Sequence, residues 1–425
     1  MNSSHVSRRR LLQTGLIGLG SLALPLSALS QSKARIVIVG GGFGGASAAR
    51  TLRGLLPAAD ITLIEANAKY TACPFSNLVI GTDRPLSKQE FAYDNLQAGG
   101  IKFIEARAQS VDAARQIVGL QDGSEVPYDR LILSPGVDMR WGVLEGYTED
   151  ASQVLPHAWK AGAQTQLLRD QLVAMEDGAT VIMTVPPAPY RCPPGPYERA
   201  SMIAHYLKAN KPRSKLIVLD AKDTFSKMAL FQEAWAEHYP DHLEWRGALD
   251  DGAVSRVDAG LKTVYTDFDA LSADVINVIP PQKAGQIADA AGVADLTGWC
   301  PIDPLTFESK LQSKIHVIGD ATIAAPMPKS GFSANLQAKV CAFAVARLLS
   351  DLEPLASTLA NTCYSYTTPD EAISIAGVYS NANGALSSIQ GAGGVSPLQA
   401  DRSVRIAEGA QASHWFETIT NEAFG

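Results

Sequence analysis

A glycine-rich turn between two short apolar runs is the feature that most constrains the fold of this chain. Residues 34–39 predict a buried parallel strand, because the run is short and rich in β-branched residues. Gly40, Gly42 and Gly45 follow directly, and the alanine-rich segment 46–55 predicts a helix. Glycines at this spacing allow a tight turn, close approach of the backbone to a pyrophosphate, and close packing of the helix on the strand.

A second strand and an acidic residue complete the pattern. Residues 60–65 predict a strand that ends on Glu65, at the distance from Gly45 where an acid binds a ribose hydroxyl. The helix N-terminus between them offers free N–H groups and a positive dipole end to phosphates. An isolated glycine-rich turn lacks these partners, so the sequence predicts a dinucleotide-binding domain.

Two later segments favour FAD over NAD as the dinucleotide. Residues 128–138 and 314–321 each predict a strand followed by a turn, and both resemble segments of flavoenzymes with two dinucleotide-binding domains. In those enzymes an acid at the position of Asp320 holds the ribityl chain or the pyrophosphate. Their FAD domain is discontinuous, with a second nucleotide-like domain inserted in the middle.

The predicted fold class is therefore α/β, with two Rossmann-like, doubly wound domains of the glutathione-reductase type and a C-terminal α+β domain on the flavin side. The C-terminal segment has β character from Thr358 to Ala376 and, less clearly, around Ile406. The predicted boundaries are a signal peptide over 1–30, an FAD domain over 33–145 and 285–355, an insert over 146–284, and a C-terminal domain over 356–425.

The insert lacks the glycine turn that an NAD(P)H site needs. A strand over 178–185 leads into a loop over 186–197 that contains six prolines and Cys192. Proline removes N–H donors and fixes φ, so this loop is a poor cradle for a pyrophosphate. A helix over 198–208 and a strand over 215–220 still follow. We therefore expect a Rossmann-like scaffold without a functional NAD site, with the reductant meeting the flavin near Cys192.

The five cysteines and seven histidines exclude several other sites. No Cys-x-x-Cys or Cys-x-x-Cys-His motif occurs, which argues against a thioredoxin-type site and against a c-type haem attached to this chain. No histidine pair has a spacing that indicates a metal site; His238 and His242 are four apart, but Pro240 interrupts any shared helix face. No metal is expected.

The N-terminus predicts export. Arg8, Arg9 and Arg10 precede an apolar stretch over 16–29 that contains two glycines and a proline, which is typical of a cleavable signal peptide. Adjacent arginines indicate the twin-arginine route and a periplasmic location. The alternative is an uncleaved anchor helix, but the stretch is shorter than the roughly 20 apolar residues of a span. No later segment predicts a membrane span.

The charge balance fits a protein partner better than nucleic acid. The chain carries a net charge of −7, and loss of residues 1–30, which hold three arginines and no acid, makes it −10. Nucleic-acid binding requires a basic face, whereas a basic protein partner would complement this balance.

Five motifs carry a specific resemblance across nearly the whole chain after the signal. The sequence resembles the flavoprotein subunit of flavocytochrome c sulfide dehydrogenase, within the FAD-dependent pyridine nucleotide-disulfide oxidoreductase superfamily. The matching segments are 70–77 (Tyr-Thr-Ala-Cys-Pro-Phe-Ser-Asn), 190–199 (Tyr-Arg-Cys-Pro-Pro-Gly-Pro-Tyr-Glu-Arg), 326–335 (Pro-Met-Pro-Lys-Ser-Gly-Phe-Ser-Ala-Asn), 361–365 (Asn-Thr-Cys-Tyr-Ser) and 414–420 (His-Trp-Phe-Glu-Thr-Ile-Thr).

The resemblance implies roles for individual residues. Cys73 would attach FAD covalently at the flavin 8α position, and Cys192 and Cys363 would form the redox-active disulfide. Glu198 would serve as a general acid–base, and Lys329 with the following helix start would stabilise negative charge at the reduced flavin.

Each of these residues has a structural alternative. Cys73 is alternatively a packing residue, Cys341 is the alternative partner of Cys192, and Glu198 alternatively meets a helix dipole. Cys300 is expected to be structural, with a bridge to Cys341 left open.

The implied activity is sulfide:cytochrome c oxidoreduction. Hydrosulfide would be oxidised at the disulfide, and electrons would pass through FAD to a c-type cytochrome subunit. The alternatives are a sulfide:quinone oxidoreductase, for which the tail 408–425 is a poor membrane anchor, and an accessory flavoprotein of a sulfur-oxidising complex without turnover of its own. An NAD(P)H-dependent disulfide reductase is a fourth reading, which the proline loop disfavours.

Overall fold

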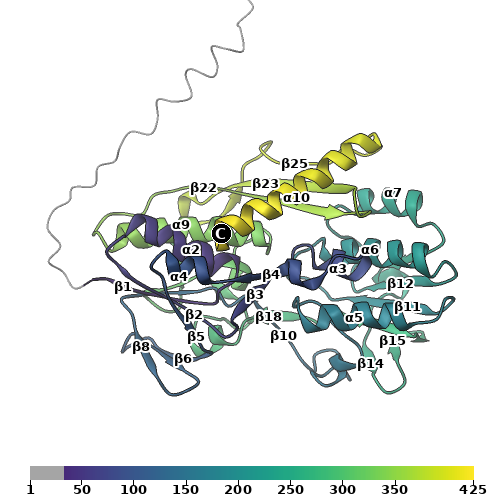
Figure 1. Cartoon of the computed structure of the whole chain (residues 1–425), viewed down its shortest axis with the longest axis horizontal. Coiled ribbons are helices and arrows are strands. Elements are labelled where there is room, and N and C mark those ends of the chain that lie inside the picture. The colour runs from purple at the N-terminus through teal and green to yellow at the C-terminus, as the bar shows by residue number, and fades with distance from the viewer. Residues whose placement is uncertain (1–32) are drawn as a thin grey trace, which may run out of the picture. The chain divides into compact units, whose positions relative to one another are not determined.

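A five-stranded parallel sheet is built around the predicted glycine turn (Figure 1). The structure is a computed structural model that describes residues 33–425, so the predicted signal peptide lies outside the described residues. The strand order is β20-β9-β1-β2-β5, and every neighbouring pair is parallel. The strands are β1 (Arg35–Val39), β2 (Asp60–Glu65), β5 (Lys102–Glu105), β9 (Arg130–Leu133) and β20 (Ile315–Val317).

Two helices cover this sheet where the glycine turn ends. Helix α2 (Phe43–Leu55) begins three residues before the predicted segment, and it packs along helix α9 (Gly331–Leu348). Cys341 lies on the buried face of α9. The alanines of α2 are fully buried, which lets the helix lie close to β1.

A second parallel sheet lies within the predicted insert, in the order β13-β12-β11-β17. The first sheet takes strands from both predicted FAD segments, so the chain leaves one doubly wound unit and returns to it; the predicted boundaries stay predictions. The elements are β11 (Thr180–Val185), β12 (Lys215–Asp220), β13 (Leu243–Arg246), β17 (Val275–Val278), α5 (Ala163–Ala174), α6 (Gly195–Asn210) and α7 (Met228–His238).

The C-terminal segment forms an antiparallel sheet and one long helix. Strand β22 (Thr358–Tyr366) pairs with β23 (Ala372–Ser380), and β24 (Ser387–Ser388) and β25 (Gly394–Val395) pair with β23. Helix α10 (Arg402–Phe424) packs on β23 (Figure 1). The prediction of weak β character around Ile406 is therefore wrong. The residues after Ile406 form a helix because the buried ones recur at helical spacing and share one face; they are Gly409, Ala412, Phe416, Ile419 and Ala423.

The predicted fold class is confirmed by the two parallel sheets and the C-terminal antiparallel region. The shorter elements connect them: β3 (Lys69–Thr71), α3 (Ser76–Gly81), η1 (Leu86–Gln89), β4 (Glu90–Ala92), α4 (Asp94–Ala98), β6 (Ala108–Asp112), β7 (Ile117–Leu120), β8 (Glu125–Pro127), β10 (Val137–Met139), η2 (Ala151–Gln153), η3 (Ala248–Asp250), β14 (Arg256–Asp258), β15 (Thr263–Tyr265), β16 (Ala270–Ser272), β18 (Gln282–Ala284), α8 (Ile287–Ala290), β19 (Cys300–Pro301), η4 (Gly319–Ala321), β21 (Thr322–Ile323) and η5 (Ala382–Gly384).

Across residues 33–425, none of the helices combines the length and the apolar character that crossing a membrane requires.

Substitution of one aromatic residue of α10 tests how the C-terminal helix is held. Phe416 is buried and stacks on Phe75 with ring centroids 4.5 Å apart. We expect Phe416→Ala to lower the free energy of unfolding by about 3–5 kcal/mol, because it removes an aromatic side chain from the core. Urea denaturation measures the change. Glu417→Ala, at an exposed neighbouring position, should stay within about 0.5 kcal/mol of the wild type. Equal effects of the two substitutions would show that α10 is not anchored by the face that contains Phe416.

Candidate active site

A cavity of about 500 Å³, the dinucleotide cavity, opens at the glycine turn. It lies at the carboxyl ends of the first sheet's parallel strands, where ligands of doubly wound folds bind. Five of the predicted cofactor-binding residues line it: Gly40, Gly42, Glu65, Cys73 and Asp320.

The glycines are required by close backbone approach. Gly40 has φ +98°, and a Cβ at this position would lie 2.2 Å from the carbonyl oxygen of Ser134. Gly45 does not line the cavity, but a Cβ there would lie 1.8 Å from the carbonyl oxygen of Gly40. Gly45 therefore brings α2 against the turn, which is the packing role expected for the third glycine.

The two acids offer oxygens suited to a flavin dinucleotide. Glu65 ends β2, and its carboxylate accepts the Gly41 N–H at 2.8 Å and the Asn67 N–H at 3.0 Å, which fixes it beside the turn. Asp320 is held in η4, and its Oδ1 is buried with no hydrogen-bond partner among the described residues. Burial raises the pKa of Asp320. An orphaned buried oxygen on a cavity wall fits a ligand hydroxyl, so the residues present fit FAD.

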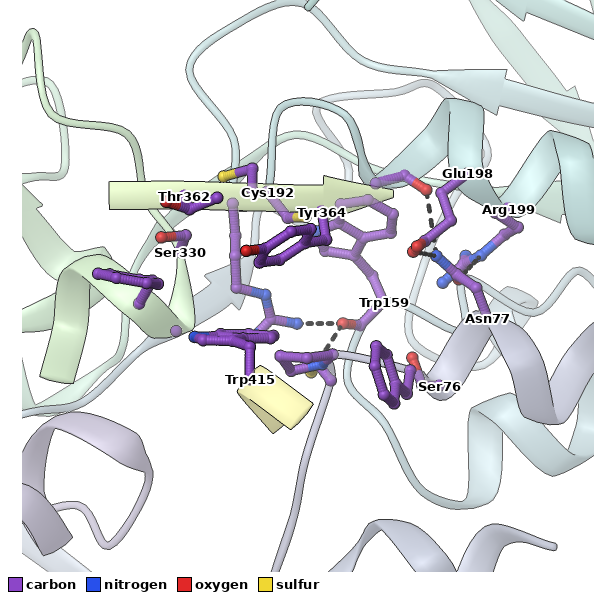
Figure 2. Close-up of a pocket in the computed structure, with 18 residues that line it drawn as sticks. Ser76, Asn77, Trp159, Cys192, Glu198, Arg199, Ser330, Thr362, Tyr364 and Trp415 are labelled. Carbon is purple, nitrogen blue, oxygen red and sulfur yellow. Dashed lines mark hydrogen bonds between the residues drawn. The ribbon is translucent and has the colours of Figure 1, made fainter. Parts of the chain in front are cut away.

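A second, smaller cavity has a volume of about 90 Å³ and is called the cysteine cavity here; Figure 2 shows the side chains that line it. Cys73, Cys192, Cys363 and Glu198 all line it. Four residues line both cavities: Cys73, Pro74, Arg191 and Gly331. The Cys73 thiol thus lies at the junction between the dinucleotide cavity and the other two cysteines.

Cys192 is presented by the loop between β11 and α6. Its backbone has φ +55°, a region that non-glycine residues rarely adopt, and two prolines follow it. Its N–H donates to the carbonyl oxygen of Lys329 at 2.8 Å, and its own carbonyl accepts the Gly195 N–H at 2.8 Å. The proline loop therefore holds Cys192 against the segment that precedes α9.

Cys363 approaches from the C-terminal sheet. It lies on β22, is 8% exposed, and its Sγ accepts a hydrogen bond from Asn361 Nδ2 at 3.2 Å. Burial raises the pKa of both thiols, Cys192 and Cys363. All five cysteines are unbridged in this structure. Cys300 and Cys341 are fully buried in the core and do not line the cysteine cavity, so Cys363, not Cys341, shares a cavity with Cys192.

Glu198 lies in the first turn of α6 and points at the cysteine cavity. Its carboxylate accepts a hydrogen bond from Asn77 Nδ2 at 2.7 Å (Figure 2) and another from the Tyr366 N–H at 2.9 Å. Burial raises its pKa, although these donors oppose the shift. The two alternatives for Glu198, a general acid–base and a carboxylate at a helix dipole, are compatible. One carboxylate lies at the helix N-terminus and also lines the cavity.

Lys329 is placed differently from the expectation. Its ammonium donates to the carbonyl oxygens of Asp320 at 2.8 Å and Thr322 at 2.6 Å and lies 3.8 Å from the centre of the Trp299 ring. It lines a third cavity rather than the two described above. The helix start after it does reach the site, since Ser330 lines the cysteine cavity and Gly331 lines both.

Two basic residues of the site are not among those predicted from the sequence. Lys227 donates to the carbonyl oxygens of Cys363 at 2.9 Å and Ile373 at 3.2 Å and to Ser365 Oγ at 2.8 Å. No motif surrounds Lys227, so no sequence signal marks it. Arg191 lies inside the proline loop next to Cys192, and this position in the sequence is enough to indicate that it belongs to the site.

The fold and site define a class, the pyridine nucleotide-disulphide oxidoreductases, whose family pattern matches residues 34–174. Within it, residues 165–280 match "Sulfide dehydrogenase (flavocytochrome c) flavoprotein chain, central", and residues 356–424 match "Flavocytochrome c sulphide dehydrogenase, flavin-binding". Over 45 residues the chain is 56% identical to the sulfide dehydrogenase flavoprotein chain of Chlorobaculum thiosulfatiphilum, covering 11% of this chain and 94% of that sequence. The chain belongs to the flavoprotein-chain family of flavocytochrome c sulfide dehydrogenase.

More distant relatives share the fold and the broad activity class. The mitochondrial sulfide:quinone oxidoreductase of Mus musculus is 21% identical over 335 residues, covering 73% of this chain and 71% of the relative. The crystal structure of sulfide:quinone oxidoreductase from Aquifex aeolicus superposes with a TM-score of 0.72 at 18% identity, covering 92% of each chain. The chain is therefore an FAD-dependent, sulfide-oxidising flavoprotein of this type.

A pair of glycine substitutions within α2 tests the dinucleotide cavity. Gly45→Ala forces a Cβ into the Gly40 carbonyl, so we expect most of the bound flavin to be lost. The ratio of flavin to protein absorbance in the purified chain measures this. Gly54→Ala lies in the same helix with open space around it, and should keep its flavin and gain up to about 1 kcal/mol of stability. Full flavin content in Gly45→Ala would contradict the assignment.

A stability titration tests the burial of Lys227. Burial lowers its pKa to about 8 from the ordinary 10.5. Between these values the unfolded chain binds more protons than the folded one, so this residue's contribution to stability rises with pH. As the pH rises through this window, we expect the free energy of unfolding of wild type to increase relative to that of Lys227→Arg. The reason is that arginine stays charged throughout. Denaturation at a series of pH values measures it, and parallel curves would contradict a buried ammonium here.

Proposed function

We propose that this chain is the flavoprotein subunit of a sulfide dehydrogenase that passes electrons to a c-type cytochrome. One observation carries the proposal: Cys192 from the insert and Cys363 from the C-terminal sheet line one cavity, which shares Cys73 with the dinucleotide cavity. A two-cysteine centre against a flavin site suits thiol–disulfide chemistry with a small sulfur nucleophile.

In the oxidised enzyme, Cys192 and Cys363 form a disulfide. Hydrosulfide attacks one of the two sulfurs, the S–S bond breaks, the attacked cysteine becomes a persulfide, and the other leaves as a thiolate that carries the electron pair. Bound FAD supplies the two-electron acceptor beside this pair and the donor of single electrons that a cytochrome needs. The net change turns hydrosulfide into sulfane sulfur, one proton and two electrons.

Two side chains assist the opening of the disulfide by hydrosulfide. Glu198 lines the cavity with a raised pKa, which suits a group that takes the hydrosulfide proton near neutral pH. The Lys227 ammonium lies on the Cys363 carbonyl, and its charge opposes the effect of burial on the pKa of both cysteine thiols. The thiolate that leaves is therefore stabilised by a nearby cation.

Cys73 holds FAD through a thioether at the flavin 8α carbon. The support is its position, since its side chain lines both cavities at their junction. Gly40, Gly42, Glu65 and Asp320 hold the rest of the cofactor.

The electron acceptor is a c-type cytochrome subunit, and the complex is periplasmic after twin-arginine export. The family names support the acceptor, and a net charge of −7 suits a basic partner surface. The signal pattern in residues 1–30 supports the route.

An anaerobic bleaching experiment tests the function. The purified chain is mixed with sulfide in one cuvette and NADH in another, and flavin absorbance is followed. We expect bleaching by sulfide alone, reversed by oxidised cytochrome c. Reversal by a soluble quinone and not by cytochrome c would move the protein to the sulfide:quinone oxidoreductases, and bleaching by NADH alone would reject the proposal.

Serine variants of the cysteines locate the reaction. Cys192→Ser and Cys363→Ser should each lower the rate of bleaching by sulfide by at least about 100-fold, because either change removes the disulfide. Cys341→Ser is the matched control, since Cys341 is buried in α9 away from the cavity. Rapid bleaching in Cys363→Ser would reject the cysteine pair as the reacting centre.

A further inference from the structure

Cys73 and Arg191 meet at one backbone oxygen. The Cys73 thiol points at the carbonyl oxygen of Trp159, with 3.7 Å between Sγ and oxygen, and Arg191 Nη2 donates to the same oxygen. Both side chains line both cavities. The guanidinium is therefore a neighbour of the thiol at the place where the two cavities join.

The backbone of Arg191 is fixed, and most of its donors are unused. The Arg191 N–H donates to Gln282 Oε1 at 3.0 Å. Within residues 33–425, the bond to Trp159 is the one hydrogen bond of its guanidinium. Burial by itself would lower the pKa of Arg191, but the negative charges of the Cys73 thiolate and the Asp320 carboxylate raise it.

The nearby Arg199 cannot serve in the same way. All three of its guanidinium nitrogens are bonded, to Asn77, to the carbonyls of residues 157–158 and to Asn277. Arg199 and Tyr70 also interact electrostatically with Cys73, and burial raises the pKa of Tyr70, so its phenol stays neutral. Arg191 is the cation with donors free to act on the thiol.

We propose that the chain attaches its own FAD, with Arg191 stabilising the thiolate of Cys73 that forms the bond. This inference rests on the covalent attachment in the proposed function. The thiol and the 8α carbon each lose a proton to solvent, a C–S bond forms, and the electron pair remains on the flavin. Dioxygen then takes two electrons and two protons to give hydrogen peroxide, which restores oxidised, covalently held FAD.

The test measures the covalent fraction of flavin in the purified, flavin-loaded full chain. Acid precipitation separates free from attached flavin, and intact-protein mass spectrometry counts attached FAD, so the readout does not depend on sulfide oxidation. Arg191→Gln keeps an N–H donor toward the Trp159 carbonyl but removes the charge. In air, we expect its attachment to be roughly tenfold slower than in wild type at neutral pH.

A second variant separates charge from shape. Arg191→Lys keeps the charge and should attach most of its flavin. If Arg191→Gln does not retain FAD, Arg191→Met, which fills similar space without charge, replaces it in the comparison.

The outcomes are distinct. If wild type holds no covalent flavin, or Cys73→Ser holds as much as wild type, the attachment at Cys73 in the proposed function is wrong and this inference falls with it. If wild type is covalent through Cys73 and Arg191→Gln attaches FAD at the wild-type rate, or Arg191→Lys is as slow as Arg191→Gln, only the role of Arg191 is overturned. Sulfide bleaching is scored separately.

Discussion

The buried guanidinium of Arg199 is the interaction on which the geometry of the site depends. It is 2% exposed and donates to Asn77, to both carbonyls of residues 157–158 and to Asn277, so it joins α3, the loop before α5, α6 and β17. Asn77 in turn donates to Glu198. A buried charge is tolerated when its hydrogen bonds are made. Removal of this network would leave several unpaired polar groups and would release the elements that carry the cysteines.

A second long-range contact positions Cys192. The hydrogen bond from the Cys192 N–H to the Lys329 carbonyl ties the proline loop of the insert to the start of α9. Cys363 reaches the same cavity from β22, and Cys73 reaches it from the segment before α3. Three parts of the chain, far apart in sequence, therefore each deliver one thiol to the cysteine cavity. The chemistry is a property of the assembled fold and not of any one segment.

The sequence predicts what is encoded locally. The strands predicted over 60–65 and 215–220 have these same bounds in the structure, and the glycine turn has the expected spacing. What escapes prediction depends on distant contacts or on side-chain direction. Lys227 meets Cys363 across 136 residues, with no local motif to mark it. Lys329 lies in the expected segment, but its side chain turns toward Trp299, because two carbonyls and an aromatic face satisfy its ammonium there.

The insert retains a Rossmann scaffold, although the positions that bind a nucleotide in such a fold are occupied by other interactions or replaced. Asp220 ends β12, where such a fold places the acid for a ribose, yet it is fully buried. Its Oδ2 accepts the Tyr197 hydroxyl at 2.6 Å and the Trp245 indole N–H at 3.2 Å, and Lys222 binds Oδ1 at 2.6 Å. With both oxygens occupied and the glycine loop replaced by prolines, what this sheet still provides is rigidity. A rigid scaffold is what a strained loop requires if it is to hold Cys192 at a fixed place beside the flavin site.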